Sequence, residues 1–180
     1  YIISSTDDWM KFANDVNGGY TYSGENVKLT ANLESISSTV GVADGEGNLR
    51  NPFSGTFDGG GHTIDVNIYD DAKQGAAPFR YINGATIKNL TVTGLVSTSK
   101  DHAAGLVGFA DGTGNTIENC TVSASVCGGD YVGGILGHGK TCPEINIDNC
   151  VFSGEINGGD TKKGVILGWG NNEVTATINN

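Results

Sequence analysis

Positive charge and long apolar stretches are scarce in this chain of 180 residues. It has 10 Lys and Arg against 20 Asp and Glu, and its longest basic run is the pair Lys162-Lys163. Nucleic acids and anionic lipids bind to positive surfaces, so we expect neither as a partner. No apolar stretch approaches the roughly 20 residues that a helix needs to cross a membrane, so we also expect no membrane span.

The usual motifs of metal and cofactor sites are also missing. The four cysteines form no Cys-x-x-Cys pair, and no His-Glu-x-x-His segment occurs. Acidic residues gather around Asp44 and Asp70, but without the spacing of a calcium-binding loop. We therefore expect no metal and no cofactor. The acidic segments are interpreted as solvated turns, with bound calcium as the open alternative.

Glycine and small or β-branched residues dominate instead. The chain has 29 Gly and only 17% charged residues, which is typical of strands and turns. A period of 30 residues is marked by Ile87, Ile117, Ile147, Asn89, Asn119 and Asn149. Such a period indicates stacked repeats, and parallel crossover connections are right-handed. The sequence therefore predicts an all-β fold, a right-handed parallel β-helix with rungs of about 30 residues.

We expect one domain over residues 1–180, in three parts. Residues 1–24 form a helical cap, residues 25–84 irregular first rungs, and residues 85–180 regular repeats. Ser5 begins a segment with the form of a capping box, apolar residues follow at helical spacing, and Gly18-Gly19 ends it. This pattern predicts an amphipathic helix from about Thr6 to Asn17 that covers the first rung. A helix docked elsewhere is the alternative.

The asparagines of the repeat lie where the alternation of inward and outward residues slips by one position. Asn tolerates the left-handed conformation of a sharp corner, and stacked Asn amides can bond along the stack. We therefore predict a structural ladder of Asn89, Asn119 and Asn149. Asn89 and Asn119 also match the Asn-x-Thr glycosylation pattern. A laddered amide is expected to be inaccessible to that modification.

Four rings occupy one position of the repeat: Tyr81, Phe109, His138 and Trp169. They are candidates for a sugar-binding strip or for an internal stack that seals the core. Arg80 is expected to face outward, because an unpaired interior Arg is costly, and alternation then turns the rings inward. The same alternation turns an apolar stripe outward, where it needs a covering loop or a partner. This stripe consists of Leu106, Ile135 and Ile166.

The cysteines fall into two groups. Cys120 and Cys150 share an inward column, and side chains in parallel register point the same way. We therefore expect buried thiols there rather than a disulfide. Cys127 and Cys142 lie in loops that we expect at different corners, and whether they are bridged stays open.

The segment Gly137-His138-Gly139 resembles a short motif of polygalacturonase-like β-helix hydrolases. Those enzymes also need clustered Asp residues, which provide a general acid and activate a water molecule. No Asp–Asp pair lies one repeat away from His138. The segment is better explained as the local copy of the repeat, and we expect no catalytic residue.

The repeats also resemble a known motif. Gly105-Leu-Val-Gly108 and Gly134-Ile-Leu-Gly137, following Ile-x-Asn-Cys-x-Val, resemble the GLUG motif. Residues 6–13 and 55–64 resemble the leader and the start of the repeat region in GLUG-containing bacterial surface proteins, so the likeness covers most of the chain. It implies a β-helix in a secreted or cell-surface, adhesin-like bacterial protein. The pattern is broken at Val66, Arg80 and Val165, so we expect distorted first and last rungs.

These points favour a monomeric, non-enzymatic adhesion or structural module that binds a protein or carbohydrate partner. A polysaccharide-degrading lyase or hydrolase and a passive stalk or spacer are the alternatives. Ile178 follows Ile147 at a spacing of 31 and, like it, begins an Ile-x-Asn segment. We expect residues 174–180 to pair on the stack, and the natural protein to continue or another element to cover this rung.

Overall fold

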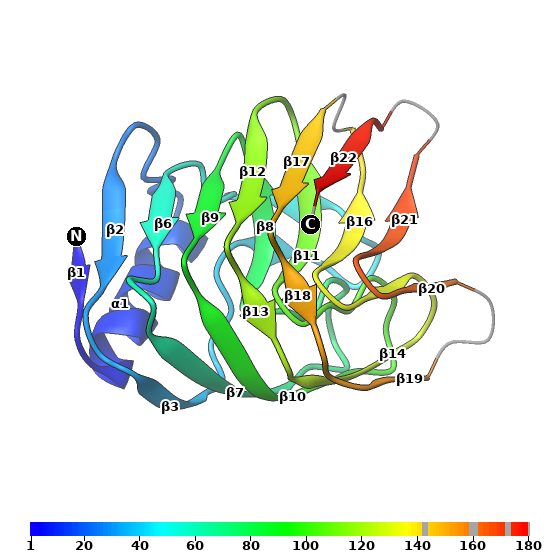
Figure 1. Ribbon diagram of the computed structural model, residues 1–180, viewed down its shortest axis with the longest axis horizontal. Helices are drawn as coiled ribbons and strands as arrows, with labels where there is room; N and C mark the ends of the chain where they lie inside the picture. The colour runs from blue at the N-terminus through cyan, green and yellow to red at the C-terminus, as the bar shows by residue number, and fades with distance from the viewer. Residues whose placement is uncertain (142–143, 159–161, 172–173, 180) are drawn as a thin grey trace.

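The computed structural model of the chain is a parallel β-solenoid of about 6 turns with a short helix at its N-terminus. Figure 1 shows strands side by side along the long axis, from the blue N-terminal turn to the red C-terminal turn. The structure describes residues 1–141, 144–158, 162–171 and 174–179. The predicted fold class is confirmed.

Within the described residues, three long parallel sheets form the sides of the solenoid. The first sheet consists of β1 (Ile2–Ile3), β2 (Asn26–Leu29), β6 (Thr56–Asp58), β9 (Thr86–Lys88), β12 (Asn115–Glu118), β17 (Ile145–Asp148) and β22 (Ala176–Asn179). The second consists of β3 (Leu33–Ile36), β7 (Thr63–Tyr69), β10 (Thr91–Ser97), β13 (Thr121–Val122), β14 (Ser125–Gly128), β18 (Val151–Phe152) and β19 (Ile156–Gly158). The third consists of β8 (Phe79–Asn83), β11 (Val107–Asp111), β16 (Leu136–Gly139) and β21 (Leu167–Gly170).

Two small strand pairs complete the fold. Strand β15 (Val132–Gly133) pairs in parallel with β20 (Lys163–Gly164). Strands β4 (Val42–Ala43) and β5 (Leu49–Arg50) form an antiparallel hairpin. This hairpin lies in the irregular first part of the chain and is the exception to parallel pairing among the strands described.

Helix α1 (Thr6–Asn17) has the predicted bounds and caps the N-terminal end of the solenoid (Figure 1). The Ser5 hydroxyl accepts a hydrogen bond from the Asp8 backbone N–H at 3.2 Å, which satisfies a free donor of the first turn. Trp9 and Phe12 are fully buried against rings of the first rungs, with Trp9 edge-on to Phe57 and Phe79. The helix therefore covers the rung that would otherwise expose the aromatic core.

The asparagine corner is built as the repeat predicts. Asn89, Asn119 and Asn149 have φ values of 54°, 52° and 49°, in the left-handed region that Asn tolerates. The Asn119 amide donates to Asn89 Oδ1 at 3.3 Å, and the Asn149 amide to Asn119 Oδ1 at 2.8 Å. The expected inaccessibility is wrong for Asn119 and Asn149, which are exposed because the ladder runs along the outer edge of the solenoid.

The main core fills the space between the three sheets. Ile87, Ile117 and Ile147 pair in one register and are fully buried, with Cys120 and Cys150 in the same core. Ile147 also pairs with Ile178, so residues 176–179 stack on the preceding rung as predicted. The last residue lies outside the described part of the chain.

The predicted outward stripe is wrong. Leu106 and Ile135 are fully buried in the main core, and the half-buried Ile166 packs against it. Each lies in a bend immediately before a strand of the third sheet, not within the strand itself. The rule of alternation applies to extended strands, so it fails across this bend, and two successive residues such as Leu106 and Val107 both face the core.

Candidate functional site

The predicted ring column lies outside the main core. Tyr81 and Phe109 are buried in a second cluster with Ala43, His138 is also buried, and Trp169 is half-buried. In the pairing of β11 with β8, Val107 faces Phe79, and the next pairs are Phe109 with Tyr81 and Ala110 with Ile82.

Val107 and Ala110 belong to the main core, so the ring between them points to the other side of the sheet. The rings are therefore buried as expected, but outside the solenoid wall and not within it. Between Val107 and Ala110 the strict alternation of inward and outward side chains is broken, and this break is why the rings lie outside the wall.

The β4–β5 hairpin covers the N-terminal half of the column. Ala43 packs with Tyr81 and Phe109, and the half-buried Leu49 packs against the same cluster. At the hairpin tip, the Lys140 ammonium donates a hydrogen bond to the Gly47 carbonyl at 3.1 Å. The irregular segment that contains this hairpin thus serves as a lid over the outer face of the third sheet.

Two further rings, which the sequence analysis missed, complete the cluster. His102 stacks on His138 with ring centroids 4.5 Å apart and on Tyr131 at 4.8 Å. Both His102 and Tyr131 have positive φ values, 66° and 62°, as does Gly75 at 72°. His102 and Tyr131 each lie three residues before the second apolar segment of their repeat, as Lys162 does in the next repeat, and Gly75 lies two residues before its segment. The constant spacing in the regular repeats was therefore a signal in the sequence.

We call this column (Gly75, His102, Tyr131 and Lys162) the strap column, because its backbone crosses the third sheet. A Cβ atom on Gly108 would lie 2.3 Å from the Gly75 carbonyl oxygen, and one on Gly137 would lie 2.4 Å from that of His102. The strap carbonyls therefore lie directly on the neighbouring strand. Glycine at these positions is required by close packing.

The rings pack against one another and against polar side chains, and little of their surface is exposed. We call the cluster the ring seam; it consists of Tyr81, His102, Phe109, Tyr131, His138 and Trp169. The Lys162 ammonium lies over both Tyr131 and Trp169, 4.4 Å and 4.0 Å from the ring centroids. Asn171 bridges the last two rings of the column, since its Oδ1 accepts from Trp169 Nε1 at 3.0 Å and lies 3.1 Å from His138 Nε2. A sugar-binding strip would need open ring faces, so the arrangement favours a sealing role.

The two histidines of the seam are held neutral. Burial lowers the pKa of His102 to about 3, with further lowering from the nearby His138 and Lys140. Burial also lowers the pKa of His138. The Nδ1 atoms of both rings are buried without a hydrogen-bond partner. The bond of His138 to Asn171 favours the charged form of that ring, but burial outweighs it and leaves the pKa lowered.

Arg80 points to the outer side, as expected, but it is buried rather than solvated. Its guanidinium pairs with Asp70 at 2.6 Å and also bonds the Gln74 carbonyl and the Thr39 hydroxyl. Burial tends to raise the pKa of Asp70, but the hydrogen bond and charge of Arg80 outweigh it and leave that pKa below its usual value. This pair fastens the turn at residues 70–74 to β8.

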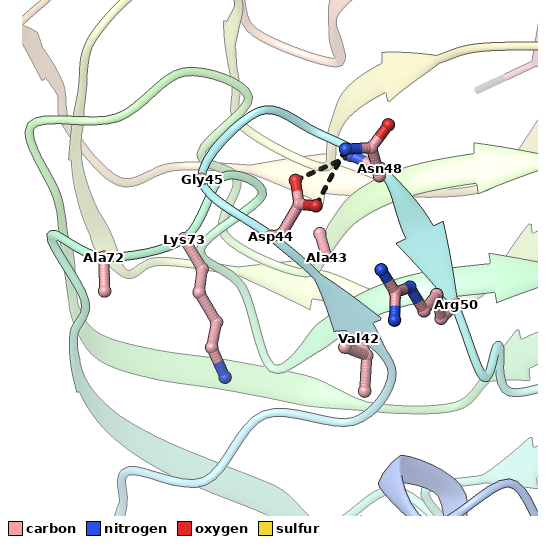
Figure 2. A pocket seen from close by; sticks show the side chains of 8 residues that line it. All are labelled: Val42, Ala43, Asp44, Gly45, Asn48, Arg50, Ala72 and Lys73. Carbon is pink, nitrogen blue, oxygen red and sulfur yellow. Dashed lines mark hydrogen bonds between the residues drawn. The ribbon is translucent and has the colours of Figure 1, made fainter.

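A pocket of about 350 Å³ opens between the β4–β5 hairpin and this turn (Figure 2). Val42, Ala43 and Ala72 give it an apolar wall, and we call it the hairpin pocket. Figure 2 shows Lys73 and Arg50 flanking Val42, with the Asp44 carboxylate turned toward Asn48. The pocket therefore combines apolar surface with two cationic side chains.

The Asp44 carboxylate is occupied within its own loop. It accepts hydrogen bonds from the backbone N–H groups of Glu46 and Asn48 and from the Asn48 amide, at 2.9, 3.0 and 2.8 Å. The bonds from Asn48 and Glu46 lower the pKa of Asp44 to about 2. Asp44 is a loop-closing residue.

The structure tests the predictions for the cysteines only in part. Cys120 and Cys150 are buried in the main core as expected, and the hydrogen bond with Cys150 together with burial raises the pKa of the Cys120 thiol. Cys127, for which a bridge to Cys142 was left open, is a free cysteine in the structure, and Cys142 lies outside the described residues. In the described part of the chain, no group of three or more His, Cys, Asp and Glu side chains is arranged to hold a metal ion, and no helix is long and apolar enough to cross a membrane.

Comparison with known proteins gives one local similarity. Halomucin of Haloquadratum walsbyi is 30% identical to the chain over 123 residues, which is 63% of this chain and 1% of halomucin. The chain thus spans about 1% of the length of this curated relative. No family model and no solved structure matches the chain.

Proposed function

We propose that the chain is a non-enzymatic adhesion or structural module of a secreted or cell-surface protein, and that it acts as a monomer on a protein or glycan partner. The observation that carries this proposal is the in-register stacking of the rungs in all three long sheets. Neighbouring rungs are tied together by backbone hydrogen bonds, and the rungs of Asn89, Asn119 and Asn149 also by the asparagine ladder. Such a stack is a stiff rod, suited to holding a surface at a distance.

The outer columns of the sheets support a role in presentation. On the first sheet, Thr56 pairs with Thr86 and Thr86 with Thr116; on the second, Thr63 pairs with Thr91 and Thr91 with Thr121. Parallel strands lie about 4.8 Å apart, so these hydroxyls form regular polar rows. Polar, flat and repetitive surfaces are compatible with weak, multivalent contacts to a large partner.

The similarities support the same proposal. The GLUG-like segments of the sequence resemble bacterial surface proteins, and the local match is to a protein whose name marks it as a mucin. Because the match covers about 1% of halomucin, the role of the whole protein to which this chain belongs is part of the proposal.

The experiment is a binding screen of the purified chain on arrays of glycans and matrix proteins, with the heat-unfolded chain as control. We expect hits that require the folded state and bind in the micromolar to millimolar range. The same glycans are incubated with the chain and assayed for new reducing ends and unsaturated sugars. Chain cleavage would support the enzyme alternative, and a screen without any hit would support the spacer alternative.

A further inference from the structure

The cations of the hairpin pocket have no ion-pair partner in the described structure. Arg80 with Asp70 is the ion pair found among the described residues, so it leaves the exposed Arg50 and Lys73 without a carboxylate at contact distance. The Asp44 carboxylate forms no ion pair with Arg50, because its oxygens are hydrogen-bonded within the loop. The two groups interact only by the longer-range attraction of their charges.

The two carboxylates nearest to Lys73 along the chain are also occupied. Asp71 accepts hydrogen bonds from the Tyr69 hydroxyl and from the Ser99 backbone N–H. Asp70 accepts hydrogen bonds from the backbone N–H groups of Ala72 and Lys73, at 3.0 and 3.2 Å, in addition to its pair with Arg80. The lining of the pocket therefore presents two cations and one occupied carboxylate, in a chain whose net charge is −10. This local reversal of sign favours an anionic ligand.

The size and the walls of the pocket further restrict the class of ligand that it can hold. Its volume of about 350 Å³ lies at the small end of the range for small-molecule sites, which suits one ring and not a peptide helix. Val42, Ala43 and Ala72 offer no side-chain hydrogen bonds, so the ligand needs an apolar face against them. Arg50, Asn48 and Lys73 are exposed at the rim, which leaves room for a chain to continue beyond the ring.

We propose that the hairpin pocket binds one uronate residue, a sugar ring that bears a carboxylate, within an acidic polysaccharide. The C–H face of the ring packs on Val42 and Ala72, which are accessible in the lining, and the carboxylate is held by Arg50 and Lys73. Arginine suits this role because its planar guanidinium can donate two parallel hydrogen bonds to a carboxylate. The inference rests on the proposed function, since it names the chemical class of the glycan partner.

The test titrates the chain with trigalacturonate and, as the neutral counterpart, with galactotriose, by calorimetry and by NMR shifts of the hairpin amides. For a single occupied ring we expect a dissociation constant of about 1 mM for the acidic trimer. We expect no measurable binding of the neutral trimer at this pocket.

Three variants locate the site. Arg50→Gln and Lys73→Gln remove one cation each, and we expect each to weaken trigalacturonate binding about tenfold. Lys11→Gln makes the same charge change on the exposed face of α1 and is expected to bind like the parent chain. Circular dichroism checks that all three fold, which is expected because the changed side chains are exposed.

Different results overturn different claims. The pocket inference fails if Arg50→Gln and Lys73→Gln bind as tightly as Lys11→Gln, or if equimolar acetate displaces the trimer and thus reveals a plain anion site. Binding of neutral glycans alone also refutes the pocket inference but leaves the adhesion proposal intact. Cleavage of the trimer would refute the non-enzymatic proposal itself.

Discussion

Acidification from pH 7.5 to pH 5 is expected to destabilise the solenoid through His102. In the folded chain this ring is stacked between His138 and Tyr131, and burial lowers its pKa to about 3. In the unfolded chain its pKa returns to about 6.5. The unfolded state therefore binds a proton that the folded state does not take up, and stability falls as pH drops below about 6.5.

The size of the effect follows from the two pKa values. At pH 5 the unfolded histidine is almost fully charged and the folded one is neutral, which corresponds to about 2 kcal/mol of lost stability. The His102 side chain is partly exposed, so solvent screening reduces this value, and we expect a loss of about 1 to 2 kcal/mol. His138, whose pKa is also lowered by burial, acts in the same direction.

The window from pH 7.5 to pH 5 separates the histidines from the carboxylates. The pKa values of Asp44, Asp58, Asp70 and Asp71 are lowered in the folded chain. Groups of this kind stabilise the fold above their unfolded pKa of about 4, and that stability is lost only as pH falls further. A loss that is already present at pH 5 therefore does not come from them.

Urea unfolding followed by far-ultraviolet circular dichroism measures the effect at several pH values. With a slope of about 2 kcal/mol per molar urea, the midpoint of the parent chain is expected to fall by about 0.5 to 1 M between pH 7.5 and pH 5. In His102→Asn, which keeps a residue type that tolerates the positive φ, the midpoint is lower at pH 7.5 but its pH dependence is flatter. His62→Asn, outside the ring seam, serves as the control. The reasoning is refuted if His102→Asn and His62→Asn show the same pH dependence as the parent chain.

Three substitutions test the packing. Leu106→Ala is expected to lower the free energy of unfolding by about 2 to 5 kcal/mol, because the side chain is fully buried. A loss below about 0.5 kcal/mol would indicate that Leu106 faces outward, as the alternation predicts. Gly137→Ala places a Cβ atom 2.4 Å from the His102 carbonyl, so a loss of about 1 to 3 kcal/mol is expected by urea unfolding, and a neutral result would contradict the strap contact. Asn119→Gly keeps the left-handed corner but removes the amide ladder, so a loss of about 1 kcal/mol is expected in thermal unfolding; an unchanged midpoint would show that the ladder contributes nothing.

The regular parts of the fold could be predicted because local rules determine them. Ser5 and Gly18-Gly19 bound the helix, and its bounds are those predicted. Asn89 and its equivalents mark a corner because few other residues tolerate a positive φ there. The register of Ile117 with Ile147 follows from the period alone, since one inward position per repeat must meet the same position of the next repeat.

The outer seam could not be predicted by the same rules. Alternation from Arg80 placed the rings inside and Leu106 outside, but a bend before the strand and a break within it each shift the pattern by one residue. The cover over the rings comes from the β4–β5 hairpin, which is far away in the sequence and follows no repeat. The charges of the hairpin pocket are likewise brought together by tertiary contacts between residues 42–50 and 72–73.

Arg80 occupies the position at which the later repeats have glycine, and the strap column explains this difference. Each strap carbonyl lies on the glycine of the following rung: Gly75 on Gly108, His102 on Gly137, and Tyr131 on Gly168. The rung of Arg80 is the first of the third sheet, before any strap of this column, so a side chain is tolerated there and bonds to Thr39 and Asp70 instead. The second glycine of each later repeat is therefore set by the rung before it, and its absence at position 80 marks where the strapped stack begins.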